Sequence, residues 1–344
     1  MIPGALPLFS SLSLLSGPGM VYCFQNNMIG KEVFPMSMDV LQEKIRQKKN
    51  PTVAGLDPRL EFIPAHILQE AYDQYGHTLQ GAAEAYRLFC RGLIDALHDV
   101  VPAVKPQSAY FEVLGSAGIA VLEELCAYAK SQGLYVIMDA KRGDIGSTCE
   151  AYASAYLGGV QVGDQIISPF DCDSVTVNGY LGTDALKPFT TLCKARNKSI
   201  FLLVKTSNQS SRELQDLIAG DRVVHTVVAD LAIRLTDKEQ LMGASGWSAI
   251  GAVVGATHPK DLMALREKYQ KLFFLVPGYG AQGGKAKDVQ YAFDRFGHGA
   301  VVNSSRGIMC AWQKTGGDGH DFMDAARAEA IRMRDDIGRF VTVL

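Results

Sequence analysis

Short apolar runs alternate with amphipathic stretches along the chain from about residue 38 onward. Each run is rich in β-branched residues and ends in polar residues or glycine, which is typical of a strand followed by a loop. The stretches between the runs, such as Gly81–Val100, Gly118–Gln132 and Asp221–Leu235, have the spacing of amphipathic helices. Eight runs follow this pattern: Thr52–Asp57, Ala103–Gln107, Tyr135–Lys141, Ser174–Asn178, Ser199–Ser207, Ile250–Thr257, Leu272–Pro277 and Gly299–Ser305.

This alternation predicts an α/β fold in which parallel strands are joined by crossover helices. Eight such units in about 300 residues predict a single-domain (β/α)8 TIM barrel, which we place at residues 38–344. A chain of 344 residues is also long enough for an open, doubly wound sheet or for two smaller domains. No Gly-x-Gly-x-x-Gly follows the first run, which weakens the dinucleotide-binding form of the open sheet.

The first 37 residues do not fit the repeating pattern. Leu6–Leu15 is apolar and rich in serine, but it is too short to span a bilayer and no Lys or Arg precedes it. A targeting segment is one interpretation. We favour a poorly ordered extension at residues 1–37, outside the fold, with Met36 or Met38 as alternative starts of the protein.

Composition narrows the classes of function. Apolar residues make up 47% of the chain and the net charge is −2, which predicts a large core and no surface for nucleic acid. Seven scattered cysteines without a Cys-x-x-Cys pair favour reduced thiols in the cytoplasm over disulfides or a zinc site. We therefore expect a cytoplasmic protein without a metal, and an anionic substrate would have to be bound by a local cluster of charge.

Polar residues gather where the predicted strands end. In a (β/α)8 barrel these ends form the active-site face, and a strand core of Val and Ile has no need of charges. The residues concerned are Asp57, Lys105, Asp139, Lys141, Asn178, Thr206, Ser207 and Arg306.

The third run carries the densest charge. Asp139 and Lys141 are two residues apart on a strand, so their side chains leave the same face, and Asp144 lies just beyond. An isolated pair of this kind is usually a structural ion pair. With Asp57 and Lys105 on neighbouring strand ends, we expect all five residues to converge on one mouth. This favours catalysis, because an alternating set keeps each lysine a cation and each carboxylate an anion.

Such a set suits the release of CO2 from an acid. A lysine ammonium can protonate a carbanion, and a carboxylate beside the departing CO2 can disfavour the ground state. After this strand, Ser147 and Glu150 have the spacing of a capping box, which predicts a helix that begins there with Thr148 in its first position.

Two later segments predict a phosphate site. The loop within Val276–Gly284 is rich in glycine and contains Gln282, whose amide can donate, and Asn303–Gly307 contains Arg306. The glycine-rich stretch alone would be a flexible surface loop. Barrels often bind phosphate with the loops after strands seven and eight, so the combination favours a phosphate site.

Taken together, these motifs resemble the orotidine 5′-monophosphate decarboxylases, in their longer bacterial (type 2) branch. The resemblance spans roughly residues 38–340. Its centre is the Asp-x-Lys-x-x-Asp signature formed by Asp139, Lys141 and Asp144. Further similar segments are Ala-Gly-Leu-Asp-Pro at 54–58, Val-Lys-Pro-Gln at 104–107, Thr-Val-Asn at 176–178, Lys-Thr-Ser-Asn at 205–208 and Pro-Gly-Tyr-Gly-Ala-Gln-Gly-Gly at 277–284.

The resemblance implies decarboxylation of orotidine 5′-monophosphate to UMP and CO2 without a cofactor, the last step of de novo pyrimidine nucleotide synthesis. It implies Lys141 as the proton donor to C6 of the pyrimidine and Asp139 as the carboxylate that faces the leaving CO2. Asp57 and Lys105 resemble ribose contacts, Lys105 also belongs to the charged network, and Ser207 resembles the residue that contacts the pyrimidine.

The family also implies a homodimer with shared sites. Asp144, Ile145 and Thr148 would enter the pocket of the partner, where Thr148 resembles a ribose contact. Gln282 and Arg306 resemble phosphate ligands.

The chain departs from the family pattern at two places. Gly179 stands where this branch suggests proline, and the extension at 1–37 has no counterpart.

Three different activities would also fit parts of the pattern. Sugar-phosphate decarboxylases and hexulose-phosphate synthases share the barrel and the signature but use a magnesium-bound enediolate. A Schiff-base aldolase would use Lys141 as its nucleophile. A barrel that binds a phosphate ligand through a decayed site would not be an enzyme at all.

Overall fold

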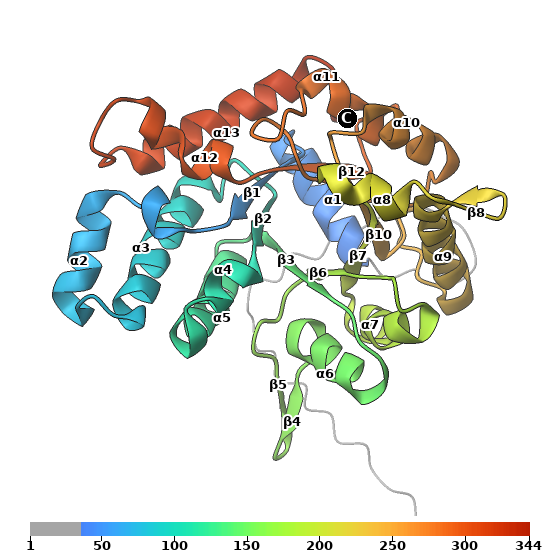
Figure 1. Ribbon diagram of the computed structural model, residues 1–344, viewed down its shortest axis with the longest axis horizontal. Helices are drawn as coiled ribbons and strands as arrows, with labels where there is room; N and C mark the ends of the chain where they lie inside the picture. Colours follow the sequence, from blue (N-terminus) through green and yellow to red (C-terminus); the bar gives the residue numbers. More distant parts are fainter. Residues whose placement is uncertain (1–35) are drawn as a thin grey trace, which may run out of the picture. The chain divides into compact units, whose positions relative to one another are not determined.

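The computed structural model describes residues 36–344, and eight parallel strands in this range close into a barrel (Figure 1). Each barrel strand pairs with the next along the chain, and the last pairs with the first. The predicted (β/α)8 barrel is confirmed, and the open-sheet alternative is wrong. The predictions about order and targeting in the extension lie outside the described residues, apart from its last two. The barrel strands are β1 (Thr52–Leu56), β2 (Ala103–Pro106), β3 (Tyr135–Arg142), β6 (Ser174–Val177), β7 (Ser199–Lys205), β10 (Ile250–Val254), β11 (Phe274–Val276) and β12 (Ala300–Ser304).

Helices follow the strands and cover the outside of the barrel, as Figure 1 shows. Two short hairpins interrupt this order, β4–β5 (Val160–Val162 and Gln165–Ile167) and β8–β9 (Ile218–Ala219 and Arg222–Val223). The longer helices are α1 (Ser37–Lys48), α2 (Ala65–Tyr75), α3 (Leu79–Leu97), α5 (Gly115–Ser131), α6 (Gly146–Leu157), α7 (Thr183–Arg196), α9 (Val224–Glu239), α10 (Pro259–Lys268) and α13 (Phe322–Gly338). The shorter ones are α4 (Ser108–Glu112), α8 (Arg212–Gln215), α11 (Ala286–Val289) and α12 (Arg306–Met309). None of the helices in the described part of the chain combines the length and apolarity required to cross a membrane.

The predicted capping box at the start of α6 is wrong. The helix begins at Gly146 with Ile145 as its N-cap, and no side chain caps it. Gly146 has a φ of 52°, which a glycine adopts readily, so the backbone itself turns into the helix before Ser147 is reached. Thr148 is therefore the third helical residue, not the first.

The N-terminal end of the barrel is closed by α1 and by aromatic side chains. Met38 and Leu41 of α1 are fully buried in one apolar cluster with Tyr135, Phe201 and Phe273. The same helix is fixed by a hydrogen bond of 2.7 Å between the Ser37 and Tyr135 hydroxyl groups. Apolar side chains therefore fill this end of the barrel.

The barrel interior becomes polar toward the C-terminal ends of the strands. On β3, Tyr135 and Ile137 belong to the apolar interior, and the next inward position is Asp139. The equivalent inward positions on β2 and β12 are Lys105 and Asn303. Because side chains on a strand alternate with period two, every second residue faces the barrel interior. The same inward face therefore carries the apolar residues at the N-terminal end and the polar residues at the C-terminal end.

Candidate functional site

A cavity of about 650 Å³ opens at the C-terminal ends of the barrel strands. It has the size of a site for a small molecule. Seven of the ten predicted site residues line it: Asp57, Lys105, Asp139, Lys141, Ser207, Gln282 and Arg306. The predicted convergence of charged strand ends on one mouth is thus confirmed in position for Asp57, Lys105, Asp139 and Lys141, but Asp144 does not line this cavity.

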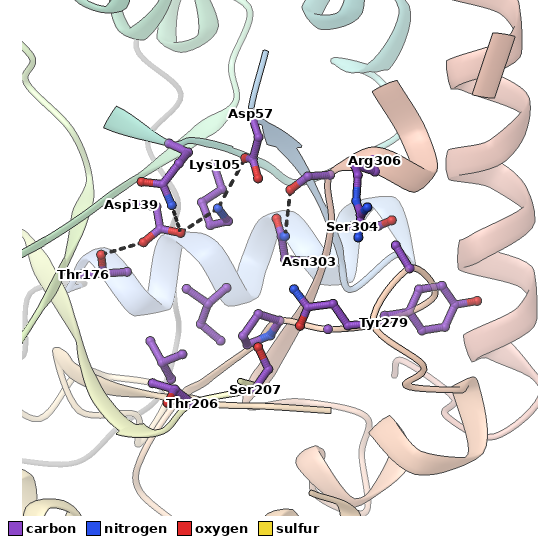
Figure 2. A pocket seen from close by; sticks show the side chains of 18 of the residues that line it. Asp57, Lys105, Asp139, Thr176, Thr206, Ser207, Tyr279, Asn303, Ser304 and Arg306 are labelled. Atoms are coloured by element: carbon purple, nitrogen blue, oxygen red, sulfur yellow. Dashed lines mark hydrogen bonds and ion pairs between the residues drawn. The ribbon is translucent and has the colours of Figure 1, made fainter. Parts of the chain in front are cut away.

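Asp139 is the centre of the charged group. Its Oδ2 accepts a hydrogen bond from the Lys105 Nζ at 2.8 Å and one from the Gln107 amide at 3.0 Å. Its Oδ1 lies 2.6 Å from the Lys141 Nζ. The Lys105 ammonium also lies 3.8 Å from Asp57 Oδ1, so the charges alternate as Asp57, Lys105, Asp139, Lys141. In Figure 2, Asp57, Lys105 and Asp139 lie together at one side of the cavity.

Burial and charge act in opposite directions on this group. Burial by itself would raise the pKa of Asp139, but the ammonium groups of Lys105 and Lys141 outweigh it and lower that pKa below its ordinary value. Burial by itself would lower the pKa of Lys105, but Asp139 and Asp57 outweigh it and raise that pKa. The carboxylate and the Lys105 ammonium are therefore both charged at neutral pH.

Lys141 meets Asp139 through an unusual backbone, not through plain strand geometry. Its φ is 50°, in the left-handed region that non-glycine residues rarely occupy. The pairing register between β3 and β6 shifts over Met138 to Arg142. The prediction that the two side chains meet is confirmed, but the extended conformation assumed for Lys141 is wrong.

The fourth barrel strand contributes Thr176 to the cavity, where the sequence suggested Asn178. Thr176 Oγ1 accepts a hydrogen bond from the Lys141 backbone N–H and donates one to Asp139 Oδ1, both at 2.9 Å. Asn178 is exposed and does not line the cavity. Thr176 was missed although the alternation along β6 could have identified it, since it lies two residues before Asn178 in the same run.

The opposite side of the cavity carries the predicted phosphate ligands. Arg306 lies at the start of α12, is exposed, and forms no ion pair with any residue in the range 36–344. Gln282 comes from the loop after β11, in which Gly278 has a φ of 97°. Tyr279 of this loop donates a hydrogen bond of 2.6 Å to Asp336 on α13, so the loop is tied to the outer helix. Ser304 and Arg306 appear together on this side in Figure 2.

Asn303 lies between these two sides in Figure 2. Its amide nitrogen donates to Ser305 Oγ at 3.3 Å, while its buried Oδ1 has no hydrogen-bond partner among residues 36–344. Gly55 on β1 makes room for this pair, because a Cβ at that position would overlap the Ser305 hydroxyl. Asn303 was not predicted as an individual site residue, although the segment that contains it was predicted to bind phosphate.

The rim contains an aromatic group that the sequence pattern did not predict. The Arg59 guanidinium lies 5.6 Å from the centre of the Phe62 ring and 5.3 Å from that of Tyr110. All three residues line the cavity. The one signal for this group in the sequence is that Arg59 directly follows the Ala-Gly-Leu-Asp-Pro segment.

The segment that leads to Ser207 contains another buried lysine, Lys205. Strict alternation would turn Lys205 into the barrel, but a register shift between β7 and β10 turns it outward, where it is fully buried and paired with Asp216. The side-chain amide of the neighbouring Gln215 accepts a hydrogen bond from the Thr206 backbone N–H at 2.9 Å and donates one to the Thr206 hydroxyl at 2.7 Å. The segment that carries Ser207 into the cavity is therefore fixed by the end of α8.

Three predicted residues lie outside this cavity. Asp144, Ile145 and Thr148 belong to the loop after β3 and the first turn of α6, and none of them lines the cavity. Ile145 is 58% exposed although it is apolar. Their predicted place in the pocket of a partner stays a prediction.

Within residues 36–344 no group of three or more His, Cys, Asp or Glu side chains is arranged to hold a metal ion. The charged cluster of the cavity instead alternates carboxylates with lysines, whose ammonium groups have no lone pair for a metal.

Comparison with known proteins agrees with the resemblance of the motifs. Residues 88–315 match the model of the orotidine 5′-phosphate decarboxylase / HUMPS family. An orotidine 5′-phosphate decarboxylase from Rhodopirellula baltica is 43% identical over 301 residues, which cover 86% of this chain and 97% of the relative. One from Caldicellulosiruptor bescii is 40% identical over 80% of this chain and 90% of its own.

A solved structure gives the same result. The OMP decarboxylase of Leishmania donovani superimposes with a TM-score of 0.67 at 30% sequence identity. The match covers 89% of this chain and 98% of the other. The similarity therefore spans the whole barrel and is not confined to the signature.

Proposed function

This chain belongs to the orotidine 5′-phosphate decarboxylase / HUMPS family, and we propose that its cavity converts orotidine 5′-monophosphate to UMP and CO2, the last step of pyrimidine nucleotide synthesis. The observation that carries the proposal is the row Lys105–Asp139–Lys141 at one side of a cavity whose other side presents Arg306. This distribution of charge fits a nucleotide whose reacting carbon and phosphate lie at opposite ends.

The reaction requires a place for a pair of electrons. As the bond between C6 and the carboxylate breaks, the electron pair stays on C6 and CO2 leaves. The ammonium of Lys141, whose side chain is 45% exposed, then gives a proton to C6 and later recovers one from solvent. Fixed positive charge beside the developing carbanion needs little reorganisation, so it lowers the barrier more than water does.

Asp139 has two tasks in this scheme. It holds the two ammonium groups 2.8 and 2.6 Å from its oxygens, which places the proton donor. As a buried anion, it also repels the substrate carboxylate in the ground state and loses that repulsion when neutral CO2 forms. Asp57 and Lys105 would contact the ribose, and Ser207 the pyrimidine.

The phosphate supplies binding energy far from the reacting carbon. Arg306 and Gln282 would bind its oxygens together with backbone N–H groups of the two loops. Binding of a remote group of this kind can be used to order a loop and exclude water from the reacting end. No cofactor has a task in the scheme.

The experiment is the loss of absorbance of orotidine 5′-monophosphate with purified protein in EDTA, repeated with Lys141→Ala. We expect metal-independent turnover that falls by about 10⁴-fold or more in the variant. Turnover only with magnesium and a sugar phosphate would instead move the assignment to the sister activity within the family. Borohydride trapping of a substrate adduct on Lys141 would favour the aldolase.

We also propose that the protein is a homodimer in which Asp144, Ile145 and Thr148 complete the partner's site. The supporting observation is that these residues lie outside their own cavity, with Ile145 exposed. An equal mixture of Lys141→Ala and Asp144→Ala chains tests this. Shared sites predict that about a quarter of the wild-type activity returns, because half of the dimers are mixed and each has one intact site. If Asp144 acted in its own site, mixing would restore nothing.

A cytoplasmic location is part of the same proposal. The six cysteines among residues 36–344 are all buried and none forms a disulfide, which fits a reducing compartment. Fractionation of cells that express the full chain would test it.

A further inference from the structure

We propose that Thr176 is a positioning residue that couples the backbone of Lys141 to the carboxylate of Asp139 and so fixes where the Lys141 ammonium lies. The inference rests on the proposed function for its kinetic test, but its geometry stands independently. Thr176 lies on β6, opposite the C-terminal part of β3, and is 1% exposed.

The Thr176 hydroxyl has no freedom of direction. The Lys141 backbone N–H can only donate, and it lies 2.9 Å from Thr176 Oγ1, which therefore accepts. A hydroxyl has one proton, and its acceptor is Asp139 Oδ1, also at 2.9 Å. Since a carboxylate in its ionised form can only accept, the proton of Thr176 points to Asp139.

The hydrogen bond to the backbone supports a conformation that would otherwise be unfavourable. Lys141 is one of five non-glycine residues between 36 and 344 with positive φ, and among these five it is the one that lines the cavity. The left-handed region is unfavourable for an L-residue, because its Cβ comes too close to the following carbonyl oxygen. At the same place the pairing between β3 and β6 is irregular, and the Thr176 side chain takes up the N–H of Lys141.

The hydroxyl of Thr176 and the ammonium of Lys141 bind the same carboxylate oxygen of Asp139. Oδ1 accepts from the Thr176 hydroxyl and from the Lys141 Nζ, while Oδ2 accepts from Lys105 and Gln107. Each carboxylate oxygen thus has two donors, which holds the plane of the carboxylate in one orientation. Removal of the hydroxyl takes one donor away from Oδ1 and also releases the backbone that carries the lysine.

Thr176 contributes nothing to the phosphate side of the cavity, so its loss should separate chemistry from binding. A displacement of about 1 Å at the proton donor can cost on the order of 100-fold in rate. Gln282 and Arg306 lie on other loops of the cavity, so the substitution should leave their proposed contacts with the phosphate unchanged. The expected result is therefore a lower kcat with little change in KM.

The test compares Thr176→Val, which removes the hydroxyl at nearly constant shape, with Thr176→Ser, which keeps it. We expect Thr176→Val to lose about 100-fold in kcat and Thr176→Ser to stay within several-fold of wild type. The matched control is Thr190→Val, which removes a buried hydroxyl that donates to Lys187 O at 3.0 Å inside α7. Equal activity of the Val and Ser variants at position 176, high or low, would overturn the proposal.

Crystal structures of both variants give a readout that needs no turnover. The valine variant should show the φ of Lys141 relaxed to negative values and its Nζ moved away from Asp139, and the serine variant should show neither. An unchanged Lys141 in the valine variant would overturn the proposal even if the wild-type chain proved to have a different reaction. If the valine chain fails to fold, Thr176→Ala is compared with Thr176→Ser in the same two measurements.

Discussion

The two ends of the barrel both bury positive charge, and they compensate it differently. At the C-terminal end, the buried Lys105 ammonium is paired with the carboxylate of Asp139, which also binds the half-exposed Lys141. At the N-terminal end, Arg266 on α10 is 8% exposed and has no carboxylate within ion-pair distance among residues 36–344. Its guanidinium instead donates to four backbone carbonyls and lies 3.9 Å from the centre of the Phe274 ring.

This difference in how the positive charge is compensated assigns a structural role to the N-terminal end and a functional role to the C-terminal end. Backbone carbonyls cannot change charge or move, so Arg266 is fixed in a structural role that ties together the segments before β11 and β12. Burial lowers the pKa of Arg266 to about 9, which still leaves it protonated at neutral pH. The carboxylates and lysines at the C-terminal end instead line a cavity, where their charges can act on a substrate and a lysine can give up a proton.

The largest effect on this comparison should come from Arg266→Met. The change leaves the carbonyls of Tyr269, Leu272, Ala292 and Gly299 buried without this donor. We expect the free energy of unfolding in urea to fall by roughly 4 kcal/mol. The kcat of the fraction that stays folded should be unchanged.

Arg266→Lys is the control, because it keeps the charge and loses most of the donors. It should lie between wild type and Arg266→Met in stability. If Arg266→Met instead lowered kcat at unchanged stability, the two ends would not be independent.

At the C-terminal end of the barrel, Asp139→Asn should change how the free energy of unfolding depends on pH. Asp139 has a folded-state pKa below its ordinary value, so its ionised form stabilises the fold at neutral pH. This contribution is complete above about pH 5 and is lost as the pH falls through about 4 and below. We expect Asp139→Asn to lower the free energy of unfolding by roughly 3 kcal/mol at pH 7. Urea titrations at several pH values should show this gap closing in acid, and a gap independent of pH would contradict the assignment.

Arg306→Ala should affect the nucleotide through its phosphate only. We expect kcat/KM for orotidine 5′-monophosphate to fall on the order of 100-fold, since charge-assisted hydrogen bonds to the phosphate are lost. For the phosphate-free nucleoside, orotidine, the loss should be slight. Equal losses on both substrates would reject Arg306 as a phosphate ligand.

The smallest expected effect is that of Gly55→Ala on β1, next to Asn303 and Ser305. The added Cβ would overlap the Ser305 hydroxyl, which must move together with the segment that leads into Arg306. We expect KM to rise about tenfold, or roughly 1.4 kcal/mol. Gly338→Ala is the matched control, because a Cβ there meets nothing within 4 Å. If the KM of Gly55→Ala equalled that of the control, the displacement of Ser305 would not weaken substrate binding, and the prediction would be wrong.

The sequence predicted the barrel well because its signal is local and repeated. Apolar runs that end in polar residues identified all eight barrel strands, and those polar ends identified the charged residues Asp57, Lys105, Asp139, Lys141 and Arg306 of the cavity. Local patterns failed where the backbone departs from regular geometry. The capping box at Ser147 was wrong because Gly146 starts α6 earlier. The alternation along β6 places Thr176 on the same face as Asn178, but its hydrogen bonds to Lys141 and Asp139 cross to another strand and cannot be predicted from one strand.

What the sequence by itself determined is which residues share the mouth of the barrel, since the order of strands and the period of side chains fix that. The tertiary structure decided how the charges are connected. The left-handed backbone of Lys141, the hydroxyl of Thr176 and the register shift that turns Lys205 outward each depend on a neighbouring strand. Their physical reason is that hydrogen bonds between strands, not propensities within one, set the backbone at the strand ends.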